Sequence, residues 1–149
     1  MRFLTAVALA LVMLWVPVDG VAQDLRPIDE ILDSAEGDPA VLAYGTRRCA
    51  ALWANYQLLW MEDRPELSET FNQQKALLIV AAHRFAQAKQ EREVPLATTA
   101  QEINDIAQIY RERADRNRAL TGDYFAGDPL VERDGATCRA MVQMLADRL

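Results

Sequence analysis

Two cysteines about 90 residues apart restrict how this chain can fold. Cys49 lies within an apolar stripe of helical period in the stretch Asp38 to Asp63. At 100° per residue, the stripe falls within about 80° either side of Cys49. Its other members are Leu52, Trp53, Tyr56, Leu59 and Trp60. Cys138 lies on a matching stripe near the end of the chain, so we expect the chain between them to fold back until the two stripes meet.

The first 22 residues have the pattern of a secretory signal peptide. Arg2 precedes an apolar run over residues 3–16, and residues 20–22 (Gly-Val-Ala) place small side chains before a cleavage point. The run is too short to span a bilayer comfortably. We therefore expect residues 1–22 to be removed and residues 23–149 to form a single domain in the periplasm or outside the cell. An uncleaved N-terminal anchor is the alternative.

Export makes a disulfide the expected state of the two cysteines. In an oxidising compartment two cysteines normally form one bridge, and Cys49 with Cys138 is the intramolecular pairing that this chain allows. A loop of about 90 residues closed in this way stabilises the fold by roughly 4–5 kcal/mol on the loop-entropy model. Two free thiols, or an intermolecular bond, are the alternatives.

Helical periodicity and turn signals divide the chain into helices, with no segment of alternating strand pattern. A short helix is expected within residues 24–36. Four longer helices are expected at 38–63, from 65 or 68 to 91, at 99–120, and from 128 to the end of the chain. Their connections are short, so neighbours should run antiparallel. The predicted fold is all-α: an antiparallel four-helix bundle with a short extra N-terminal helix, stapled by one disulfide.

Capping residues support these boundaries. Asp38-Pro39 and Asp128-Pro129 each combine a preferred N-cap residue with proline at the first helical position. Ser68 is a possible cap of the second long helix, and Thr99 with Glu102 predicts a capping box at the start of the third.

Two glycines leave the course of their helices open. Gly45 either lets another segment come close or divides its helix into a short turn and a main helix from Thr46. Gly135 either lies within the last helix or interrupts it, and in the second case Asp134 would cap a new helix.

Composition argues against several classes of function. The formal net charge is −6 at pH 7, which disfavours binding to nucleic acid or to anionic lipid. Neither the Glu-x-x-His pattern of di-iron bundles nor the Cys-x-x-Cys-His pattern of c-type haem attachment occurs, so no metal or cofactor is predicted. No second apolar stretch is long enough to cross a membrane after signal cleavage. Arginines at 111, 113, 116 and 118 are interleaved with acidic residues, which favours a solvated helix end over an anion site.

Two groups of side chains are candidate binding residues. Trp53, Tyr56 and Trp60 would either fill the core or line an apolar pocket inside the bundle. The candidates for a surface that contacts a protein partner are Leu58, Ile109, Tyr124, Phe125 and Leu130. The last three lie in or beside the loop 121–128, which either presents them to a partner or tucks them back against the bundle.

These features predict a non-enzymatic interaction protein of the cell envelope: an adaptor, an inhibitor or an accessory subunit with a protein partner. The alternative is a carrier of a small apolar ligand in the pocket near Trp53 and Trp60. The weakest hypothesis is an enzyme in which His83, the single histidine, acts as a general base oriented by Glu102 or Asp105.

Overall fold

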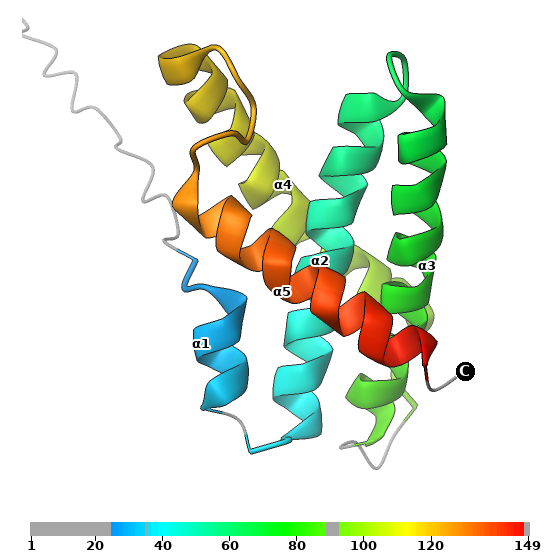
Figure 1. Cartoon of the computed structure of the whole chain (residues 1–149). Helices are drawn as coiled ribbons and strands as arrows, with labels where there is room; N and C mark the ends of the chain where they lie inside the picture. The colour runs from blue at the N-terminus through cyan, green and yellow to red at the C-terminus, as the bar shows by residue number, and fades with distance from the viewer. Residues whose placement is uncertain (1–24, 35, 89–92, 148–149) are drawn as a thin grey trace, which may run out of the picture.

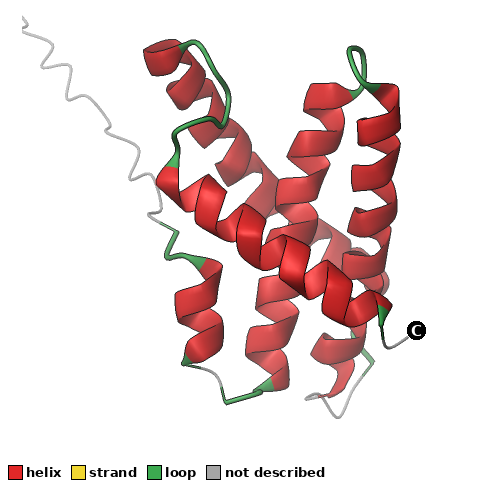
Figure 2. Ribbon diagram, in the orientation of Figure 1, coloured by secondary structure: helices red, strands yellow, loops and turns green. Residues whose placement is uncertain are grey.

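The protein is all-helical in the part of the chain that its structure, a computed structural model, describes: residues 25–34, 36–88 and 93–147. Five helices occur there and no strands (Figures 1 and 2). They are α1 (Ile28–Asp33), α2 (Pro39–Trp60), α3 (Pro65–Ala88), α4 (Leu96–Thr121) and α5 (Pro129–Ala146). The predicted signal peptide, residues 1–22, lies outside the described residues. None of the described helices is long and apolar enough to cross a bilayer.

Helix α2 is the centre of the fold and contacts each of the other four helices. Helices α2 and α3 lie side by side as an antiparallel hairpin (Figure 1). Helix α5 crosses α2 obliquely on one side, whereas α4 passes behind it (Figure 1). This central place explains why ten residues of α2, all between Ala43 and Asn55, are buried.

The predicted disulfide is present and joins α2 to α5. The Cα atoms of Cys49 and Cys138 are 5.2 Å apart, and both side chains are fully buried. The bridge therefore holds α5 against the central helix, as the matching apolar stripes predict.

Both Asp-Pro sequences cap their helices as predicted. The side chain of Asp38 accepts a hydrogen bond from the backbone N–H of Ala40, and Asp128 accepts from Leu130 and Val131. Gly122 ends α4 with a φ of 84°, a left-handed conformation that glycine adopts without steric cost.

At two other helices a proline marks the start in place of the candidate cap: α3 uses the first of its two predicted starts, and the predicted capping box at Thr99 is wrong. Helix α3 begins at Pro65 and α4 at Leu96, directly after Pro95. The fixed φ of proline suits the start of a helix. Ser68 therefore lies within α3 and donates to the carbonyl of Gln57 at 3.0 Å, while Thr99 is buried within α4.

Neither Gly45 nor Gly135 breaks its helix. A Cβ atom at Gly45 would lie 3.1 Å from Leu32 of α1 and 3.4 Å from Met141 of α5. Gly45 thus allows α1 and α5 to pack closely on α2, which is the first of its two predicted roles. Asp134 consequently caps no helix but lies fully buried within α5.

Candidate functional site

Three of the five predicted partner-surface residues lie together in a groove. Leu58 near the end of α2, and Tyr124 and Phe125 in the α4–α5 loop, line a cavity of about 240 Å³ between α2 and α4. The two helices diverge toward their C-terminal ends, and the loop closes one side (Figure 1). The other lining residues are Asn55, Leu59, Arg111, Ala114 and Asp115. We call this cavity the α2–α4 groove.

The groove combines apolar walls with exposed charge. Leu58 is 51% exposed, and Met61 beyond the end of α2 is 54% exposed. Phe125 is buried beneath the groove, where its ring centroid lies 4.8 Å from that of Tyr56. Arg111 and Asp115 project from α4 and are both exposed. An apolar patch that carries isolated charges is the usual composition of a surface that binds protein.

The loop that forms one wall of the groove is held by local hydrogen bonds. Asp123 accepts from the backbone N–H groups of Phe125 at 3.0 Å and Ala126 at 2.9 Å, and these bonds lower the pKa of its carboxyl group. The phenol of Tyr124 accepts a hydrogen bond from Arg118, whose guanidinium carbon lies 4.5 Å from the centre of the ring. The wall is therefore positioned before any partner arrives.

The two remaining candidates for this surface lie elsewhere. Ile109 is half-buried on α4, outside the groove, and Leu130 is buried at the start of α5. Because Phe125 and Leu130 are both buried, the loop tucks back against the bundle, which was the other prediction for this segment. Tyr124 remains half-buried and accessible in the groove wall.

Two of the three predicted aromatic pocket residues, Trp53 and Tyr56, pack against each other and against other rings. Trp53 is buried, and its ring centroid lies 5.6 Å from that of Tyr56 and 5.3 Å from that of Phe71. Trp60 is half-buried beside Arg64, whose guanidinium carbon is 5.7 Å from the ring centre. None of the three predicted residues lines the α2–α4 groove. The indole N–H of Trp53 has no acceptor within the described part of the chain.

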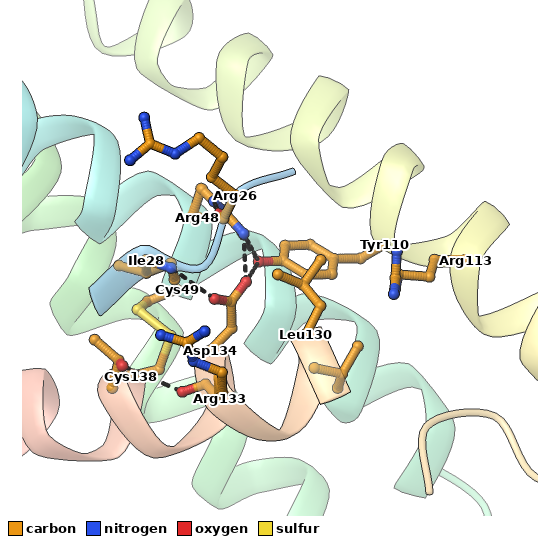
Figure 3. A network of polar contacts seen from close by, with 12 residues as sticks. Arg26, Ile28, Arg48, Cys49, Tyr110, Arg113, Leu130, Arg133, Asp134 and Cys138 are labelled. Atoms are coloured by element: carbon orange, nitrogen blue, oxygen red, sulfur yellow. Dashed lines mark hydrogen bonds and ion pairs between the residues drawn. A yellow bond between two sulfur atoms is a disulfide. The ribbon is translucent and has the colours of Figure 1, made fainter. Parts of the chain in front are cut away.

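A network of buried polar side chains joins four parts of the fold (Figure 3). Arg48 of α2 donates hydrogen bonds to Asp134 of α5 and to Tyr110 of α4, at 3.0 Å for its Nη2 to the phenol oxygen. The phenol of Tyr110 in turn donates to Asp134. Arg48 and Asp134 are both fully buried, at 0% exposure. Because the ionised and hydrogen-bonding groups face one another, the charges are compensated within the core.

The segment that leads into α1 completes this network. The backbone N–H of Ile28 donates to Asp134 Oδ1 at 2.8 Å, and Arg48 donates to the carbonyl of Arg26. Burial raises the pKa of the Tyr110 phenol above its ordinary value, so that it stays protonated and able to donate. Arg48 lies beside Cys49, and Asp134 lies one helical turn before Cys138, so the disulfide and the network hold the same pair of helices.

Sequence reasoning missed this network, although one signal for it was available. Arg48 directly precedes an apolar stretch, Cys49 to Trp53, that is buried in the structure. A cation next to such a stretch, with an acid four residues before the other cysteine, is consistent with a buried pair. No such signal indicates that Tyr110 belongs to the network, since only the packing of α4 against α2 brings it to Arg48.

The acid–base pair proposed for His83 does not form among the described residues. Its Nδ1 lies 3.5 Å from Thr99 Oγ1, and its Nε2 lies 3.1 Å from the side chain of Gln87. Glu102 instead pairs with Arg47 at 3.3 Å, and Asp105 accepts a hydrogen bond from Gln101. In the described part of the chain, no group of three or more His, Cys, Asp or Glu side chains is placed to hold a metal ion.

A further cavity of about 310 Å³ lies at the other end of α2. Arg47, Glu93 and Glu102 line it together with small side chains such as Ala43 and Ala86. Arg47 pairs with Glu102 inside the fold. Both charges are therefore already used within the chain, unlike those of Arg111 and Asp115 in the α2–α4 groove.

Comparison of the chain with protein-family models, with curated proteins and with solved structures finds no match in any of the three.

Proposed function

We propose that this chain is a non-enzymatic protein of the periplasm or of the secreted space, and that it binds another protein through the α2–α4 groove. The observation that carries the proposal is the juxtaposition of exposed Leu58 with Tyr124, Arg111 and Asp115 in one groove. Its apolar wall would supply contact area to a partner, and its charges would select the partner and its orientation.

The character of the groove favours a protein over a small molecule. Its volume of about 240 Å³ is below the range of roughly 300–1,000 Å³ typical of small-ligand pockets, and it opens along two helices. A partner helix laid between diverging helices would bury Leu58 and Met61 together. The carrier hypothesis has less support, because two of its aromatic residues, Trp53 and Tyr56, pack against each other and against Phe71.

Site-directed photocrosslinking tests this proposal in the native cell. We expect a photoreactive phenylalanine in place of Leu58 to capture a protein partner in good yield. Val80 is the matched control, because it is 49% exposed but lies on α3, outside the groove. Comparable capture from both positions would contradict the proposal, and so would a chain that yields no crosslinked protein from Leu58 at native levels.

Leu58→Asp provides the complementary loss-of-binding test. A carboxylate in the apolar wall should abolish capture by a crosslinker placed at Tyr124, whereas Val80→Asp should leave it unchanged. Far-ultraviolet circular dichroism of both variants checks that the helices are intact.

A further inference from the structure

Arg111 and Asp115 are the two charged residues of the groove. Neither forms an ion pair or a side-chain hydrogen bond with another residue in the described part of the chain. Their neighbours differ in this respect, since Arg113 pairs with Asp128 and Arg118 donates to Tyr124. Among the described residues, the groove therefore presents one cation and one anion from the same helix that have no partner within the fold.

The spacing of these two residues makes α4 self-complementary. Residues four apart lie on the same face of a helix, about 40° apart around its axis. A two-fold axis perpendicular to α4, midway between them, reverses the direction of a second α4 helix. Arg111 of each copy then faces Asp115 of the other, and the two ion pairs are equivalent by symmetry.

The apolar residues around this pair fit the same arrangement. Leu58 lines the groove and Met61 follows it at the end of α2, and both are more than half exposed. A second copy seated on α4 would cover this apolar surface and pair both charges at once.

We propose that the α2–α4 groove binds a second copy of this chain, with the two α4 helices antiparallel and Arg111 of each copy paired with Asp115 of the other. This inference rests on the proposed function, because it assigns the same groove and names the protein that occupies it. The dimer is isologous, so it closes on itself and leaves no unpaired copy of the groove.

Charge reversal followed by mixing tests this pairing by sedimentation velocity. The natural protein should sediment as a dimer. In a dimer of the Arg111→Asp variant, each of the two contacts joins two acids. In a dimer of the Asp115→Arg variant, each contact joins two cations. Each change should raise the dimer Kd by about tenfold or more, because like charges then face each other.

An equimolar mixture of the two variants should form a dimer again. One chain then carries Asp at both positions and the other carries Arg at both, so each contact joins opposite charges. Arg116→Asp is the matched control, because this exposed arginine also lies on α4 but outside the groove, and it should leave the dimer unchanged.

Three results would overturn the pairing: a monomeric natural protein, single variants that remain dimeric, or a mixture that remains monomeric. The crosslinking experiment separates this failure from failure of the proposed function. If Leu58 captures a different protein while the chain sediments as a monomer, the groove still binds protein, but its occupant is not a second copy. If it captures nothing, both proposals fail.

Discussion

At the scale of single residues, the buried pair of Arg48 and Asp134 has the largest consequences. Removing two charges from water costs several kcal/mol per ion, and mutual attraction offsets this only when both partners are present. Such a pair adds little net stability, but it strongly penalises packings that separate its members. Here the pair joins α2 to α5, and Tyr110 adds α4, so it specifies how three helices meet.

Asp134→Asn tests this role. The change keeps the shape of the side chain but leaves the Arg48 guanidinium in the core without its counter-charge, so the free energy of unfolding should fall by about 3–5 kcal/mol. Urea denaturation measures the loss. The double change Arg48→Met with Asp134→Leu should cost less than Asp134→Asn alone, because it removes both charges.

A matched control is Asp29→Asn. Asp29 pairs with Arg133 at 2.7 Å, but both side chains are more than 40% exposed, so this change should have only a small effect. Equal losses from Asp29→Asn and Asp134→Asn would show that burial does not determine the importance of the pair.

At the scale of elements, the α4–α5 loop decides the form of the groove. It follows the left-handed Gly122, and its residues Tyr124 and Phe125 form one wall. The loop contains little backbone pairing, and the side chain of Asp123 supplies much of its internal hydrogen bonding. Asn117 of α4 adds hydrogen bonds to the carbonyls of Asp123 and Ala126, so the carboxylate of Asp123 is one of several side-chain groups that hold the loop.

The ionisation of Asp123 predicts a pH dependence of this loop. Hydrogen bonds from Ala126 and Phe125 lower its pKa from 3.8, so the folded loop favours the carboxylate. The contribution to stability is present above pH 3.8 and is lost as the pH falls through the lower folded pKa. Amide chemical shifts of Phe125 and Ala126, followed by NMR on acidification, should show a transition below pH 3.8.

Asp123→Asn is the control for this titration. Its amide group cannot ionise, so the transition at Phe125 and Ala126 should disappear while the remaining acidic residues titrate as before. A transition that persists in this variant would assign the pH dependence to another group.

At the scale of the whole molecule, the disulfide and the buried network restrain the same two helices. The disulfide limits the unfolded chain by closing a long loop, whereas the network acts only in the folded state, where its groups are assembled. Together they hold α5 across the central helix and retain α1, whose first residue donates to Asp134.

Replacing both cysteines measures the contribution of the bridge. Cys49→Ala with Cys138→Ala should lower the free energy of unfolding by roughly 4–5 kcal/mol, because the unfolded chain regains its loop entropy. Urea denaturation of the oxidised protein and of this variant gives the difference. Equal stability would mean that the unfolded chain is already compact enough for the bridge to add nothing.

Features that depend on local chemistry can be predicted from the residues alone. Helical periodicity predicts the all-α class, and Asp38-Pro39 and Asp128-Pro129 predict two helix starts, since each signal acts within one or two turns. The disulfide is also predictable, because two cysteines allow one intramolecular pairing. The candidate caps Ser68 and Thr99 each follow a proline by a few residues, and the helix begins at that proline or directly after it.

Which segments meet depends on packing between helices and cannot be predicted from local signals. The place of α2 at the centre, the meeting of Arg48 with Tyr110 and Asp134, and the groove between Leu58 and Arg111 all join residues far apart in the chain. Their proximity depends on the crossing of helices. That crossing is set by how side chains from several elements pack, and no periodicity within a single helix encodes it.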